Sequence, residues 1–481
     1  MTASYRTLGD FFSQPCTPTP VQRPQLIAFN QALAETLQLP AEFLAEETAL
    51  TLFAGNTVYS EFAPFCQAYA GHQFGHFNPR LGDGRALTIL ETLDQQGVLR
   101  DVQLKGAGRT PFSRGGDGRS PLGPVLREFI MCEAMHALGV PTTRALAAIA
   151  TGEYVQRERA EPGAVLTRVA SSHIRVGSFQ FAAAHGGPEQ VKLLADYVIA
   201  RHYPECAAQP QPYLGLLEAV IARQATLVAQ WMSFGFIHGV MNTDNTSICG
   251  ETIDYGPCAM LDSYQPEQFY SFIDKRGRYR YSQQPRIAQW NLARFAECLA
   301  PLMPTTKAAD DISAALEHFT TLYEKAWLER FSAKLGIVQP TPFDRELINQ
   351  VLVHFQQQQI DFTLGFRALA DSAEPASSAN EFAPEQRLPS ALRQQWLDRL
   401  ARQQEDFSVT AARMNTVNPV VIPRNHHLQA VIQVAQAEGD LRPFHYLLRA
   451  ATQPFNSEQK NSPWAKAPKA EQEISNTFCG T

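Results

Sequence analysis

The sequence has little of what marks a membrane protein, a secreted disulfide scaffold or a nucleic-acid binder. No run approaches the ~20 consecutive apolar residues that a membrane-spanning helix needs. The eight cysteines form no C-x-x-C pair, and the first residues, MTASYRTLGDFF, have neither a basic start nor an apolar core. The net charge of −6 gives no general attraction to nucleic acid. We therefore expect a cytoplasmic protein with reduced thiols that binds neither membrane nor nucleic acid.

Two catalytic signatures are also missing. The G-x-S-x-G turn of serine hydrolases does not occur, and no G-x-G-x-x-G loop precedes Lys105. The first absence argues against a hydrolase. The second argues against an ordinary protein kinase.

What is present is the composition and patterning of a folded α+β protein. The chain has 481 residues, 44% of them hydrophobic, which is enough for large cores without a stapling disulfide. Strand-like runs are followed by helical patterns, so the order predicts a strand-rich half and a helix-rich half with a cleft between them. The predicted strands are 86–93, 97–106, 153–158 and 164–170, and the predicted helical segments are 124–138, 190–235 and most of 310–480, around an exposed loop at 371–388.

A metal site is predicted by the segment from His238 to Gly256. Kinase catalytic loops have a His two residues before a base Asp, an Asn five residues after that Asp, and then a D-x-G motif. Here His238, Asn245 and Asp254 fit this spacing, but the base position holds Val240. We expect TSICGETI to form a hairpin that brings Asn245 and Asp254 together as ligands of Mg²⁺. The alternative is an ordinary Asn/Asp-rich turn.

A phosphate-binding lysine is predicted at Lys105, which ends an alternating strand. Kinases pair such a lysine with a glutamate on a helix. Glu128 is the natural partner on the 124–138 helix, whereas Glu133 points roughly 140° away at 100° per residue. The alternative for Lys105 is a solvated strand end.

Glycine-rich loops and arginines offer further anion contacts. Glycines allow backbone amides to approach an anion, and guanidinium groups can bind phosphate oxygens in pairs. The candidates are Gly82, Gly84 and Arg85 in one loop, Asp117 and Gly118 in a second, and Arg168 and Arg175 on either side of ASSHI. His72 and His76 have metal-pair spacing, but Gly71 and Gly75 argue against the helix that such a pair needs.

Long motifs in this chain resemble the selenoprotein O (YdiU) family of kinase-fold protein nucleotidyltransferases. The resemblance covers about residues 60–440, most of the chain. The matching segments are GHQFG, LGDGRA, QLKGAGRTPFSRGGDGRS, TRVASSHIRVGSFQ, HGVMNTDNTSI, IDYGPCAMLD and MNTVNPVVIPRNHHLQAVI.

The resemblance implies transfer of AMP from ATP, bound in reversed orientation, to Ser, Thr or Tyr hydroxyls of other proteins and of the enzyme itself. It implies Asp244 as the general base, and Asn245 and Asp254 as ligands of Mg²⁺ or Mn²⁺. Cys479 occupies the place of a selenocysteine found in some members and is a possible redox residue. Some members use uridine nucleotides with manganese. The implied nucleotide contacts are Gly82, Gly84, Arg85, Lys105, Asp117, Gly118, Arg168, Arg175 and Asp254.

Together these observations predict a protein-kinase-like two-lobe α+β fold and an adenylyltransferase that acts as a monomer. The alternatives are a kinase that transfers the γ-phosphate and an inactive nucleotide-binding scaffold. The predicted divisions are an N-terminal extension (1–80), an N-lobe (81–160), a C-lobe with the metal site (161–330) and a helical C-terminal region (331–481).

Overall fold

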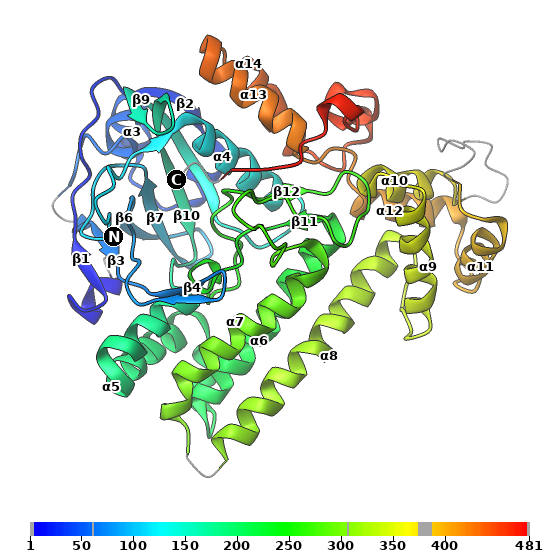
Figure 1. Ribbon diagram of the computed structural model, residues 1–481, viewed down its shortest axis with the longest axis horizontal. Coiled ribbons are helices and arrows are strands. Elements are labelled where there is room, and N and C mark those ends of the chain that lie inside the picture. The colour runs from blue at the N-terminus through cyan, green and yellow to red at the C-terminus, as the bar shows by residue number, and fades with distance from the viewer. Residues whose placement is uncertain (1–3, 60–61, 305–306, 374–386, 479–481) are drawn as a thin grey trace.

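The computed structural model describes residues 4–59, 62–304, 307–373 and 387–478. In this part of the chain an antiparallel sheet of eight strands lies at one end of the molecule, and long helices extend away from it (Figure 1). The strand order is β1-β3-β6-β7-β10-β9-β2, with β8 beside β10. The strands are β1 (Ser13–Pro15), β2 (Gln25–Phe29), β3 (Phe65–Gln67), β6 (Ala86–Leu93), β7 (Leu99–Lys105), β8 (Ser120–Pro121), β9 (Arg144–Gln156) and β10 (Ala160–Ala170).

The hairpin of β6 and β7 confirms the two strands predicted at 86–93 and 97–106. Asp94 closes its turn, because its carboxylate accepts hydrogen bonds from the amides of Gln96 and Val98, each at 2.9 Å. Lys105 is the last residue of β7 and lies opposite Leu166 of β10. The lysine is therefore held on a central strand.

Strand β9 is longer than the predicted 153–158, since it begins at Arg144. The segment that was missed is rich in alanine, which favours helix in isolation. Here Ala145, Ala147 and Ala148 are all fully buried between β10 and β2. Tertiary packing decides this strand against its local propensity.

The two faces of the sheet are covered by different helices. Side chains of β10 alternate between them: Ala164 and Leu166 pack in the core around α4, and Val165 and Val169 in the core under α1–α3. The helix predicted at 124–138 is confirmed as α4. The covering helices are α1 (Gln31–Thr36), α2 (Ala41–Leu44), α3 (Glu46–Phe53) and α4 (Leu122–Ala137).

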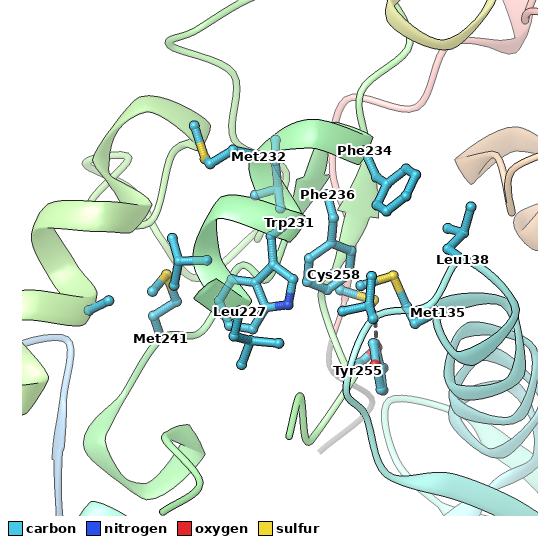
Figure 2. Close-up of a cluster of buried hydrophobic side chains, with 14 of the residues drawn as sticks. Met135, Leu138, Leu227, Trp231, Met232, Phe234, Phe236, Met241, Tyr255 and Cys258 are labelled. Atoms are coloured by element: carbon cyan, nitrogen blue, oxygen red, sulfur yellow. Dashed lines mark hydrogen bonds between the residues drawn. The ribbon is translucent and has the colours of Figure 1, made fainter. Parts of the chain in front are cut away.

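A buried cluster connects α4 with the segment that carries the predicted metal site. Figure 2 shows Met135 and Leu138, at the end of α4, grouped with Phe236 and Tyr255. Helix α6 (Pro212–Phe234) ends beside them, and its C-cap residue Gly235 has a φ of +70°, the left-handed conformation that glycine adopts readily. This packing fixes the position of Asp254, the residue before Tyr255.

The second half of the chain is mostly helical in its described part, which confirms the prediction for 190–235 and for 310–480. Helix α5 is interrupted at Gly187, where Pro188 follows. No helix of the described chain is long and apolar enough to cross a membrane. The helices are α5 (Val176–His202), α6 (Pro212–Phe234), α7 (Gln284–Leu299), α8 (Ala308–Lys334), α9 (Asp344–Gln357), α10 (Phe362–Asp371), α11 (Ser390–Ala401), α12 (Phe407–Val417), α13 (Asn425–Glu438) and α14 (Arg442–Ala451).

The hairpin predicted for TSICGETI is wrong. The short strands here are β11 (Phe236–Ile237) and β12 (Ala259–Met260), which pair with each other outside that segment. Within it, Ser247 bridges to Arg175 and Thr252 to Thr142. The two halves of the segment, before and after Gly250, thus bridge to different neighbours and do not pair with each other.

Two of the predicted divisions fall within the sheet. Strands β1, β2 and β3 precede residue 80 yet belong to the main sheet, and β10 continues past residue 160 to Ala170. The division of the chain into lobes and extensions stays a prediction. Most of the loop predicted at 371–388, and Cys479, lie outside the described residues.

Candidate active site

A cavity of about 780 Å³ lies where the sheet, α4 and the segment 240–256 meet. This volume is within the range of clefts that hold small-molecule ligands. It is lined by nearly all of the predicted site residues: Gly82, Gly84, Arg85, Lys105, Asp117, Gly118, Glu128, Arg168, Asp244, Asn245 and Asp254. Arg175 does not line the cavity, but it contacts three residues that do, Tyr69, Asp244 and Asp254.

Asp254 is the centre of a cluster of charges. Its Oδ1 accepts hydrogen bonds from Lys105 Nζ at 2.7 Å and Arg168 Nη1 at 2.8 Å. Arg175 Nη1 lies 3.7 Å from Oδ2. Burial alone would raise the pKa of Asp254, but the three cations hold it well below its ordinary value. The carboxylate is therefore ionised at any physiological pH.

Lys105 and Glu128 form the predicted ion pair, with Nζ 2.6 Å from Oε2. Glu128 also accepts from Arg168 Nη1 at 3.2 Å through Oε1. Glu133, the weaker candidate, instead binds Arg144 at 2.7 Å on the other side of α4. The helical geometry thus separates the two glutamates as the sequence predicted.

His238 joins the loop before Asp244 to Ile253, the residue before Asp254. Its Nε2 donates to the carbonyl oxygen of Ile253 at 2.9 Å, and the amide of Val240 donates to Nδ1 at 3.4 Å. Burial lowers the pKa of His238, so the ring is neutral and can make both contacts. The histidine is a positioning residue.

Asn245 presents an oxygen for a cation. Its Nδ2 donates to the carbonyl oxygen of Val240 at 2.9 Å, which leaves the amide oxygen available. Asp254 lines the same cavity. One amide oxygen and one carboxylate fit the preference of Mg²⁺ and Mn²⁺ for oxygen ligands, with phosphates and waters completing the shell.

Asp244 is a buried carboxylate at the edge of the same cavity. Its Oδ2 accepts from Gln73 Nε2 at 3.1 Å, and its Oδ1 has no hydrogen-bond partner within the described structure. Burial raises the pKa of Asp244 to about 6, although Gln73 and Arg175 act in the opposite direction. A carboxylate with this pKa and one oxygen without a hydrogen-bond partner can accept a proton near neutral pH.

Arg175 supports this carboxylate from behind. Its Nη1 donates to the backbone oxygen of Asp244 at 2.9 Å, and its guanidinium stacks 4.4 Å above the centre of the Tyr69 ring. The arginine is almost fully buried. It therefore places Asp244 and adds positive charge behind Asp254.

The loop around Gly82 leaves no room for a side chain. Gly82 has a φ of +71°, and a Cβ there would overlap the ring of Phe112. Beside it, Asp83 accepts from the amide of Gln67 at 2.9 Å. The loop is thus fixed with its backbone against the cavity.

We expect Gly82→Ala to lower the free energy of unfolding by about 2–3 kcal/mol, because the overlap with Phe112 adds to the cost of a positive φ. Gly97→Ala is the matched control, since Gly97 has a φ of +76° but nothing within 4 Å of its Cβ position. It should cost only about 1 kcal/mol. Urea denaturation of both variants measures the difference, and equal losses would contradict the role of Phe112.

The second glycine loop is held by an ion pair that the sequence did not reveal. Asp117 accepts from Arg157 Nη1 at 2.8 Å and from the amide of Arg119 at 2.9 Å. Arg157 and Arg114 also line the cavity. Asp117 is therefore as much a support for this loop as a candidate contact.

Sequence reasoning missed one residue that contacts the candidate base. Gln73, whose Nε2 donates to Asp244, lies between His72 and His76. His72 and His76 belong to a hairpin of β4 (Gly71–Gln73) and β5 (His76–Asn78), which confirms that they are not on a helix. Gly75, in the turn, indicated a break from helix, but no sequence pattern indicated that Gln73 contacts Asp244.

With this geometry established, comparison with known proteins identifies the family. A family described as "Protein adenylyltransferase SelO" matches residues 1–452. The chain belongs to the SelO family. A SelO-type relative from Rhodopseudomonas palustris, named "Protein nucleotidyltransferase YdiU", is 49% identical over 99% of this chain and 98% of its own length.

Two further relatives with the same name come from other bacteria. The one from Rhizobium meliloti is 50% identical over 99% of this chain and 98% of its own length. The one from Agrobacterium fabrum is 48% identical over 99% of both chains. The chain is therefore a nucleotidyltransferase, and the resemblance found in the sequence motifs is confirmed.

Proposed function

We propose that this enzyme transfers AMP from ATP to Ser, Thr or Tyr hydroxyls of proteins, itself included, and releases pyrophosphate. The observation that supports this most is Asp244: a buried carboxylate with one oxygen that has no hydrogen-bond partner in the described structure, lining the same cavity as the Lys105–Asp254 cluster. Val240 occupies the usual position of a kinase base. The proposed base is therefore Asp244, four residues after Val240 and next to Asn245.

In the proposed reaction, the carboxylate of Asp244 accepts the proton of the acceptor hydroxyl. The hydroxyl oxygen forms a bond to the α-phosphorus of ATP, and the bond from that phosphorus to the bridging oxygen breaks. Pyrophosphate leaves with the electron pair. Lys105 and Arg168 bind phosphate oxygens and stabilise the charge that develops on the transferred and leaving groups.

A divalent cation held by Asn245 and Asp254 would neutralise phosphate charge. Asp254 would then share its carboxylate between the cation and Lys105. The glycine loops at Gly82–Gly84 and at Gly118, with Arg85 and Asp117, would contact the rest of the nucleotide. We also propose the kinase-like two-lobe arrangement, which is supported by the Lys105–Glu128 pair at 2.6 Å.

One labelling experiment separates the candidate reactions. The protein is incubated with a test protein and ATP labelled at the α or the γ phosphate, with Mg²⁺ or Mn²⁺, and protein-bound label is counted. We expect label from the α position only. Label from the γ position would show a kinase, and label from neither would show an inactive scaffold. UTP labelled at the α position with Mn²⁺ tests uridylyl transfer in the same format.

We expect Glu128→Gln to weaken ATP binding about tenfold or more and to lower the free energy of unfolding by roughly 3 kcal/mol, because it breaks a buried ion pair and leaves Lys105 and Arg168 to share the carboxylate of Asp254. Isothermal titration with ATP and urea denaturation measure the two effects. Glu133→Gln is the matched control: it removes a buried ion pair of the same helix, with Arg144, outside the cavity. It should lower stability and leave ATP affinity intact. Equal loss of affinity in both variants would contradict the assignment of Glu128.

A further inference from the structure

A basic segment lies beside the cavity and is anchored to Asn242, two residues before Asp244. Its sequence is Lys275-Arg276-Gly277-Arg278-Tyr279-Arg280. Just before it, Ile273 lines the cavity. The segment is anchored there, because the hydroxyl of Tyr279 donates to Asn242 Oδ1 at 2.7 Å and accepts from the amide of Phe74 at 3.0 Å.

Most of this positive charge is not neutralised within the described structure. Arg280 pairs with Glu267 at 2.6 Å, but no carboxylate of the described chain forms an ion pair with Lys275, Arg276 or Arg278. Asp274 offsets part of this charge, but its two oxygens accept the backbone amides at 278 and 279 and form no ion pair with these side chains. The side chains of Lys275, Arg276 and Arg278 thus have no ion-pair partner in the described structure.

Arg278 lies closest to the hairpin that holds Asp244. Its guanidinium carbon would be 3.6 Å from a Cβ on Gly75, two residues after Gln73. It stacks 4.9 Å from the centre of the Trp290 ring, and its Nε is buried without a hydrogen-bond partner. A guanidinium stacked in this way presents its edge, which fits a carboxylate.

Apolar side chains are exposed beside these cations. Phe269, Phe272 and Ile273 are 37%, 45% and 51% exposed, and Lys275 Nζ lies 3.6 Å from the centre of the Phe272 ring. An apolar centre with cations along its edge fits an extended peptide that carries both apolar and acidic side chains.

We propose that the surface formed by residues 269–280 and Trp290, here called the basic surface, binds acidic side chains flanking the acceptor hydroxyl. The enzyme then prefers hydroxyls in acidic segments of its target proteins. This inference rests on the proposed function, because it places the acceptor chain beside Asp244. The carboxylates of the target contact Arg276 and Arg278, and its hydroxyl reaches the carboxylate of Asp244.

The test compares two synthetic peptides of equal length with one central serine, flanked by Asp and Glu in one and by Asn and Gln in the other. Transfer of label from α-labelled ATP gives kcat/KM for each. We expect kcat/KM to be about tenfold higher for the acidic peptide at low salt, and this advantage to shrink as ionic strength rises.

The double variant Arg276→Glu/Arg278→Glu should raise KM for the acidic peptide more than it changes kcat, and remove the preference. Arg402→Glu, an exposed arginine after α11, is the charge-matched control and should leave both peptides unaffected. If the double variant fails to fold, Lys275→Glu, an exposed position, and the salt dependence of the unmodified enzyme give the same information.

The outcomes separate this inference from the function beneath it. Equal kcat/KM for the two peptides, with label on both, overturns the acidic preference and leaves adenylylation standing. A preference that persists in the double variant overturns the assignment to the basic surface. Absence of α label on every acceptor, the enzyme included, removes the proposed function and this inference with it.

Discussion

Asp254→Asn is expected to lower nucleotide transfer by about 10³-fold, equivalent to roughly 4 kcal/mol of transition-state stabilisation. Asparagine has the same shape and tolerates the left-handed backbone at this position, where φ is +63°. The substitution therefore removes the charge with little other change. It deprives a divalent cation of its only carboxylate in the proposed site, and leaves Lys105 and Arg168 with Glu128 alone.

The measurement is incorporation of α label into protein, combined with titration of Mn²⁺ in the presence of ATP, followed by electron paramagnetic resonance. We expect both activity and Mn²⁺ affinity to fall. Asp262→Asn is the control, because that carboxylate binds Arg424 at 2.8 Å and does not line the cavity. Nucleotide transfer at an undiminished rate by the Asp254→Asn variant would contradict the assignment of Asp254 as a metal ligand.

Asp244→Asn should reduce kcat by about 10²–10⁴-fold, the range attributed to a general base. ATP affinity should stay within about twofold, since the side chain is held by Gln73 rather than by the nucleotide cluster. Single-turnover transfer and isothermal titration measure the two quantities. Loss of ATP binding would count against a base role.

The raised pKa of Asp244 gives two further expectations from the same residue. The base works only when ionised, so the rate should fall as pH drops below about 6. The folded pKa lies above the unfolded value of 3.8, so the protonated form is favoured by folding and the ionised form destabilises the fold above about pH 6. Asp244→Asn should therefore raise stability at pH 7, by about 1–3 kcal/mol. A rate independent of pH between 7 and 5 would contradict this account.

Much of the site could be predicted because it depends on local spacing. A strand ending at Lys105 and a helix carrying Glu128 are both set by short-range patterns, and only one face of that helix can meet the strand. The spacing of His238, Asn245 and Asp254 likewise indicated a shared site. Lys105, Glu128, Asn245 and Asp254 line one cavity, and His238 contacts Ile253, the residue before Asp254.

The rest depends on contacts that no local pattern encodes. The sequence favoured a hairpin between Asn245 and Asp254, but the two arms bind Arg175 and Thr142 instead. Strand β2 pairs with β9, more than a hundred residues later in the sequence. The start of β9 was missed because it is rich in alanine, which favours helix. Gln73 acquires its role only because the β4–β5 hairpin packs beside the turn at Thr243–Asn245.

The sheet order described above has a consequence for folding kinetics. The bonds from Lys105 and Arg168 to Asp254 close loops of 149 and 86 residues, and the partners of β2 are equally remote in sequence. The chain loses conformational entropy when such loops close, before the stabilising contacts have formed. Proteins with many non-local contacts therefore fold slowly. We expect the helices to form early from local signals, and the charge cluster of the candidate site to be among the last parts of this protein to assemble.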